Sequence, residues 1–89
     1  MGAVTETIRR KLNTAFAPER LEVVDDSDKH KGHSGARDGG ESHFTLTVVS
    51  ALFAGVGRVE RQRRINAALA EELAGPVHAL SIKSLAPGE

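Results

Sequence analysis

Two of the chain's four histidines, His30 and His33, lie in a segment with two glycines, residues 28–35, that reads DKHKGHSG. Imidazole is the commonest metal ligand that proteins offer, and it titrates near neutral pH. The chain contains no cysteine, so it cannot by itself build an all-thiolate zinc or iron–sulfur site. Any metal chemistry that needs sulfur therefore requires a partner to supply the thiolates.

Catalysis has little support in the residue pattern. The chain has no cysteine nucleophile, and it has no serine–histidine–acid set or carboxylate pair whose placement the sequence can defend. Asp25, Asp26 and Asp28 superficially resemble a site for a hard cation, but they lack the spacing and the terminal bidentate glutamate of a calcium loop. We interpret them as turn residues and expect a protein that is not an enzyme.

A cluster of four arginines follows the glycine turn at 55–57, and it comprises Arg58, Arg61, Arg63 and Arg64. At the start of a helix, such side chains and the backbone N–H groups can meet phosphate, as in helices that enter the major groove of DNA. Against this, the four arginines do not share one helix face, and three glutamates dilute their charge: Glu60, Glu71 and Glu72. Contact with DNA therefore competes with a helix face that docks a partner protein or faces solvent.

The size of the chain allows one small domain, which we expect to span residues 1–89. Twelve basic residues balance twelve acidic ones, so the net charge gives no reason for tight nonspecific binding to nucleic acid or to a membrane. Only three residues are aromatic, all phenylalanines, and the core must be mostly aliphatic. The sequence contains neither an apolar stretch of about 20 residues nor a signal-peptide core, which predicts a cytoplasmic protein.

Apolar spacing indicates the elements that must position these residues. Val4, Ile8 and Leu12 recur at helical spacing and predict a first helix that ends before Pro18. Alternation and turn residues predict the other segments: strands at 20–25, 42–50 and 77–85, a tight apolar turn at 51–57 and a helix at 58–74. Residues 27–41 contain four glycines and no large apolar side chain, which predicts a long loop that is either functional or disordered.

The order helix, strand, strand, helix, strand predicts an α+β fold. The two helices would cover one face of a three-stranded sheet, whose apolar side comes from alternating residues: Phe44, Leu46, Val48, Leu80 and Ile82. In the last strand, His78 would share this face, while Val77 would point to the other face with Ala79, Ser81 and Lys83. A right-handed crossover through the second helix would place the last strand parallel to a strand of the hairpin, giving a mixed sheet.

Several short motifs, in this order and at these spacings, closely resemble the BolA family. They are GESHF at 40–44, VS at 49–50, FAG at 53–55, RQR at 61–63, LAEEL at 69–73 and VHAL at 77–80. The resemblance covers nearly the whole chain and is weakest before Leu21. It implies an α+β fold similar to the class II KH domain. It also implies a role in iron–sulfur cluster assembly and iron homeostasis as a partner of monothiol glutaredoxins, with some members acting as DNA-binding transcriptional regulators.

The resemblance also implies a shared metal site. In a mixed heterodimer, one glutaredoxin and one glutathione would supply two thiolates to a 2Fe-2S cluster, and histidines of this chain would supply the remaining ligands. The isolated chain would hold no cofactor and would be a monomer or a weak homodimer.

His78 matches the histidine of the family's His-Ala-Leu motif and is the first of the implied ligands. The second would come from the loop at 27–41, where counting from Ser27 favours His30 and the glycine context favours His33, so both remain open. His43 alternates away from Phe44, which favours a surface or strand-pairing role. Gln62 stands where many relatives carry a histidine, so no ligand is available there.

Overall fold

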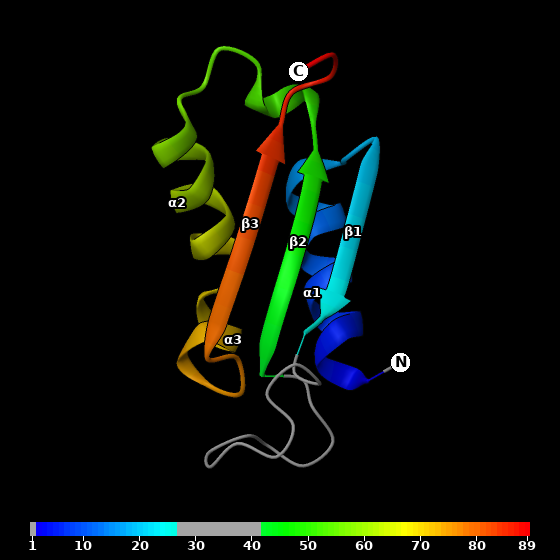
Figure 1. Cartoon of the computed structure of the whole chain (residues 1–89), viewed down its shortest axis with the longest axis vertical. Coiled ribbons are helices and arrows are strands. Elements are labelled where there is room, and N and C mark those ends of the chain that lie inside the picture. The colour runs from blue at the N-terminus through cyan, green and yellow to red at the C-terminus, as the bar shows by residue number, and fades with distance from the viewer. Residues whose placement is uncertain (1, 27–41) are drawn as a thin grey trace.

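The computed structural model describes residues 2–26 and 42–89 of the chain. Its elements follow in the order α1 Ala3–Phe16, β1 Arg20–Asp25, β2 His43–Val49, a short 3-10 helix η2 Ala51–Phe53, α2 Arg58–Ala68, α3 Ala70–Ala74 and β3 Ala79–Leu85 (Figure 1). The loop predicted at 27–41, with His30 and His33, lies outside the described residues. Within the described part of the chain, no helix is both long and apolar enough to cross a membrane.

The first helix forms where the apolar spacing predicts it. Ile8, Leu12 and Phe16 follow one another at intervals of four and are all buried. Ala17 ends α1 in the left-handed conformation (φ 42°, ψ 53°), and its N–H group donates to the Asn13 carbonyl at 3.0 Å. Pro18 follows and cannot continue the helical hydrogen bonds.

The three strands form the predicted mixed sheet in the order β1-β2-β3. β1 and β2 are antiparallel, with Arg20 opposite Val49, whereas β2 and β3 are parallel, with His43 opposite Ala79. In Figure 1, α1 lies behind the sheet and α2 runs alongside β3. Because β2 and β3 run in the same direction, both begin at the same end of the sheet.

The core lies between the helices and one face of the sheet. Phe44, Leu46 and Val48 point into it from β2, as their alternation predicts, and Leu80 and Ile82 of β3 pack against it half-buried. The rings of Phe16 and Phe53 meet with centroids 5.1 Å apart. The Ser50 hydroxyl donates to the Phe16 carbonyl at 2.7 Å, so the end of α1 is tied to the turn after β2.

The structure corrects the prediction of one continuous helix at 58–74. The backbone leaves the helical conformation at Leu69 (φ −107°, ψ 20°), so α2 ends at Ala68 and α3 begins at Ala70. The side chain of Leu69 is nevertheless fully buried. The apolar spacing of Ile65, Leu69 and Leu73 runs straight through the break, which is why the pattern carries no signal of it.

The start of the last strand also differs from the prediction. The strand begins at Ala79 and not at Val77, so the alternation of a pleated strand does not extend to Val77 and His78. Val77, predicted on the outward face, is buried in the core, and its N–H group donates to the Glu72 carbonyl at 2.9 Å. His78, predicted on the apolar face with Leu80, is exposed.

Candidate functional site

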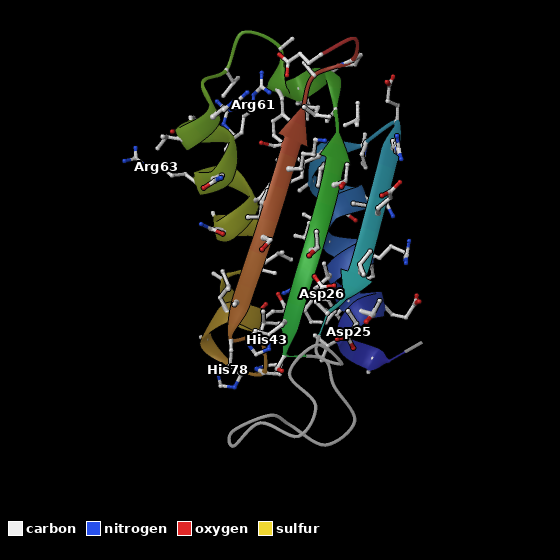
Figure 2. The ribbon with its side chains drawn as sticks, viewed as in Figure 1. Asp25, Asp26, His43, Arg61, Arg63 and His78 are labelled. Atoms are coloured by element: carbon white, nitrogen blue, oxygen red, sulfur yellow. The ribbon has the colours of Figure 1, made fainter. Side chains whose placement is uncertain are left out.

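Two histidines meet at the end of the sheet where β2 and β3 begin. His43 is the first residue of β2 and His78 directly precedes β3. Their rings are stacked, with centroids 6.1 Å apart and an interplanar angle of 19°. His78 is exposed and His43 is half-buried. Figure 2 shows both at one end of the sheet, with Asp25 and Asp26 at the neighbouring end of β1.

Backbone hydrogen bonds hold this end of the sheet together. The His78 N–H group donates to the Ser42 carbonyl at 2.7 Å, and the Asp26 N–H group donates to the His43 carbonyl at 2.7 Å. Asp26 and Ser42 are the residues that flank segment 27–41. Both attachment points of the segment that carries His30 and His33 are therefore bonded to the backbone of the histidine pair.

The side chains next to the pair have polar neighbours of their own. The Ser42 hydroxyl lies 2.9 Å from Nδ1 of His43, which is within hydrogen-bond distance. The Thr45 hydroxyl donates to a carboxylate oxygen of Asp26. Within residues 2–26 and 42–89, no group of three or more histidine, aspartate or glutamate side chains could hold a metal ion. A metal site at this end would need ligands from elsewhere.

The alternation of His43 with Phe44 is confirmed, but sequence reasoning missed that His43 lies beside His78. Alternation with Phe44 put its side chain on the open face, which by itself suggests a surface or strand-pairing residue. Its proximity to His78 depends on the parallel register that pairs His43 with Ala79, which is a long-range property of the fold. The signal in the sequence is weak, because it requires knowing that both strands start at the same end of the sheet.

The four predicted nucleic-acid-binding arginines separate into two groups. Arg58, Arg63 and Arg64 are exposed, but Arg61 retains only 6 % of its exposed area. Nε of Arg61 donates to the Val56 carbonyl at 2.7 Å and Nη1 donates to the Ser84 carbonyl at 3.0 Å. Arg61 is thus committed to joining α2 to β3, and only the other three arginines face solvent.

A carboxylate completes the surroundings of Arg61. The guanidinium donates from Nη1 and Nη2 to the two carboxylate oxygens of Glu89, at 2.6 and 2.8 Å. These bonds, together with one from the Ala86 backbone, lower the pKa of Glu89 from its ordinary value to about 2. The guanidinium also lies 5.8 Å from the centre of the Phe53 ring. The contacts leave Arg61 fixed in position.

Acidic side chains accompany the exposed arginines on α2. Glu60 lies 3.3 Å from Arg64 and 4.0 Å from Arg63. Exposed pairs of this kind contribute little stability and are screened by salt. They nevertheless reduce the local positive charge, as the sequence predicted. Glu71 and Glu72 of α3 are bound to Lys11 of α1, at 2.9 Å each.

Comparison with known proteins places this arrangement in a family. The BolA-like protein family model matches residues 12–89. BolA-like protein 1 from Pongo abelii is 46 % identical over 100 % of this chain, which spans 62 % of that protein's length. DNA-binding transcriptional regulator BolA from Vibrio cholerae is 46 % identical, and the match covers 89 % of this chain and 71 % of that protein's length.

A solved structure agrees with these sequence relatives. The BolA domain of SufE1 from Arabidopsis thaliana superimposes with a TM-score of 0.86 at 41 % identity, over 98 % of this chain and 95 % of that one. The motifs around His43 and His78, the mixed sheet and the family match over residues 12–89 all lead to one assignment. The chain belongs to the BolA-like protein family.

Proposed function

We propose that this chain is a non-enzymatic cytoplasmic adaptor in iron–sulfur cluster assembly and trafficking, and thereby in iron homeostasis. In this role it binds a monothiol glutaredoxin and shares a bridging 2Fe-2S cluster with it. His78 and one loop histidine, His30 or His33, supply this chain's ligands. Family membership supports the proposal, and the observation that carries it is the position of His78.

His78 has the exposure and the location that a shared ligand needs. Its ring is exposed at the end of the sheet, so a partner protein can approach it. Its backbone is bonded to Ser42, the residue at which segment 27–41 rejoins the fold. The point at which that segment rejoins the fold therefore lies beside His78, which supports a site shared by the two.

The donor set fits a shared cluster better than a cluster held by this chain alone. The chain offers imidazoles and no thiolate, so two thiolates must come from the glutaredoxin and glutathione. Neutral imidazoles in place of two thiolates make a cluster less negative, raise its reduction potential and make its ligation sensitive to pH. His78 and one of the loop histidines, His30 or His33, would hold such a cluster on this chain's side as neutral imidazole ligands.

Visible circular dichroism tests the ligand assignment. The chain is mixed anaerobically with cluster-loaded monothiol glutaredoxin and glutathione, and wild type is compared with His78→Ala. We expect the heterodimer spectrum to be lost in this variant. His43→Ala is the matched control, because it removes the neighbouring imidazole from the same end and should leave the heterodimer bands in place.

The same measurement decides between the loop histidines. His30→Ala and His33→Ala are measured separately, and only the variant that removes a ligand should lose the heterodimer spectrum. Backbone NMR spectra of each variant confirm that the fold is retained. A heterodimer spectrum that His78→Ala leaves unchanged would overturn the proposal.

A second candidate function is DNA binding by α2. It is favoured by the relatives named DNA-binding transcriptional regulator BolA and by the exposure of Arg58, Arg63 and Arg64. Arg61 is a poor probe, because its loss would also disturb the packing of α2 on β3. The double variant Arg58→Ala with Arg63→Ala should weaken DNA affinity and reduce the slope of its salt dependence by about 1 for each lost phosphate contact.

The control for DNA binding is Arg20→Ala, which removes an exposed arginine from β1. We expect this variant to bind DNA as wild type does. An unaltered affinity and salt slope in the double variant would exclude α2 as the element that contacts phosphate.

A further inference from the structure

A pocket of about 540 Å³ lies at the end of the sheet opposite His78, between the start of α2 and the end of β3. Three cationic residues line it: Arg58, Arg61 and Lys83. Among the described residues that line it, Glu89 is the one acid. Figure 2 shows Arg61 at this end of the molecule, with His78 at the other. The pocket is therefore separate from the histidine pair and carries an excess of positive charge.

The guanidinium of Arg61 is a preformed carboxylate receptor. Its two terminal nitrogens hold the two oxygens of Glu89 side by side, which is the geometry that makes arginine selective for carboxylates. Arg61 would keep its place without Glu89, because the carbonyls of Val56 and Ser84 hold it from two sides. Glu89 shows which chemical group fits this position.

Glu89 itself is held less firmly than its partner. Its side chain retains 43 % of its exposed area, compared with 7 % for that of Arg61. Apart from Arg61, its side chain accepts a hydrogen bond from the Ala86 N–H group at 2.9 Å, and its backbone N–H group donates to the Ala86 carbonyl at 3.1 Å. The Glu89 side chain can therefore move out toward solvent while Arg61 stays in place.

The start of α2 adds a second anion-binding feature to the pocket. The N-cap residue of this helix of eleven residues is Gly57, which has no side chain to bond to the first N–H groups. A Cβ atom built on Gly57 would meet nothing within 4 Å, so there is open space at this point. Free N–H groups and the helix dipole favour negative charge at a helix N-terminus.

We propose that this pocket binds a small polycarboxylate anion. One carboxylate of the ligand replaces Glu89 on Arg61, and a second lies near the start of α2, between Arg58 and Lys83. Glu89 acts as a built-in competitor that occupies the receptor until such a ligand displaces it. The volume is in the range of small-molecule sites, and the three cations match an anion with more than one charge.

An NMR titration with citrate at constant ionic strength tests the proposal. We expect saturable shifts at the backbone of Gly57 and Arg58 and at the Nε–H group of Arg61. Glu89→Gln should bind citrate at least about tenfold more tightly than wild type, because the competing charge is gone. Lys83→Ala should weaken binding, and it alters an exposed strand residue whose loss leaves the core intact.

Glu60→Gln is the matched control. It removes one negative charge from the same helix, but Glu60 pairs with Arg63 and Arg64 and does not line the pocket. Its citrate affinity should stay within about twofold of wild type, since exposed charges interact weakly. An equal gain in citrate affinity in Glu60→Gln and Glu89→Gln would show that citrate responds only to the net charge of the protein, and it would overturn the proposal.

Inorganic phosphate is titrated in parallel to test the class of ligand. Citrate should bind more tightly, because Arg61 is already arranged around a carboxylate. Tighter binding of phosphate would contradict the assignment to carboxylates. Absence of saturable shifts with citrate in both wild type and Glu89→Gln would exclude the site altogether.

Discussion

The carboxyl group of Glu89 is held in its ionised form by Arg61, so the stability of the fold depends on the protonation of this group. Its pKa in the folded protein is about 2, well below the ordinary value near 4.5. A lowered pKa stabilises the fold above the ordinary value, and that contribution is lost as the pH falls toward 2. The ion pair between Glu89 and Arg61 thus stabilises the fold at neutral pH, and this stabilisation is lost between about pH 4.5 and about pH 2.

We therefore expect Glu89→Gln to flatten the acid limb of the stability curve. The free energy of unfolding, measured with urea between about pH 5 and about pH 2, should fall less steeply in the variant than in wild type. Arg61→Lys keeps the positive charge but loses the two-pronged geometry, so its slope should be intermediate. Equal slopes for wild type and Glu89→Gln would show that the carboxylate makes no such contribution.

At the level of single residues, the sequence identified more candidates than the structure brings together. His78 was predicted on the apolar face of the last strand, but it stands just before that strand and is exposed. Arg61 could not be told apart from the other arginines, because its burial depends on a distant carboxylate, Glu89. The stacking of His43 on His78 could not be predicted for the same kind of reason, since His78 stands before a strand that is distant in the sequence.

Among the elements, α1 has an unfavourable terminus that a substitution can improve. Ala17 adopts a left-handed conformation with φ 42°, which costs a residue with a Cβ atom about 1 kcal/mol and costs glycine little. Ala17→Gly should raise the free energy of unfolding by about 0.5–1 kcal/mol. Chemical denaturation measures the change.

The matched control for Ala17→Gly is Ala15→Gly, which lies two residues earlier, exposed and within the helix. Ala15 has an ordinary helical conformation, so glycine relieves no unfavourable φ there, and it loses more conformational entropy on folding than alanine does. The substitution should therefore lower the free energy of unfolding by about 0.5–1 kcal/mol. The same sign of change in both variants would contradict the assigned end of α1.

Element boundaries reveal how far local pattern reaches. The end of α1 and the hairpin strands were predictable, because Pro18 and the alternation around Phe44 and Leu46 are local signals. The mixed sheet followed from the rule that crossover connections are right-handed. The break at Leu69, between α2 and α3, and the burial of Val77, between α3 and β3, were not, because both side chains are buried in the core by residues distant in the sequence. Apolar spacing predicts that a side chain is buried, but it does not indicate which residues pack against it.

For the whole molecule, stability depends on a small core to which β2 contributes Phe44, Leu46 and Val48. Leu46 is fully buried at the centre of the sheet. Leu46→Ala should lower the free energy of unfolding by about 2–5 kcal/mol, which is a large share of the total for a domain of this size. Urea unfolding followed by circular dichroism measures this loss.

The control for the core is Thr47→Ala, the next residue of β2, whose side chain lies on the opposite face of the sheet. We expect a change within about 0.5 kcal/mol, as for most substitutions outside the core. Similar losses in the two variants would contradict the assignment of one sheet face to the core and the other to solvent.

Because β2 and β3 pair in parallel, the contact between His43 and His78 depends on a long-range step of folding. His43 and His78 are neighbours only when β3 is docked beside β2, which closes the chain between the two strands into a loop that contains α2 and α3. Pairings between distant parts of a chain are slow to form, because closing the intervening loop costs entropy before any contact offsets it. A nascent or partly folded chain consequently exposes both imidazoles without their native geometry. Recognition at this end of the sheet can thus distinguish finished molecules from unfinished ones.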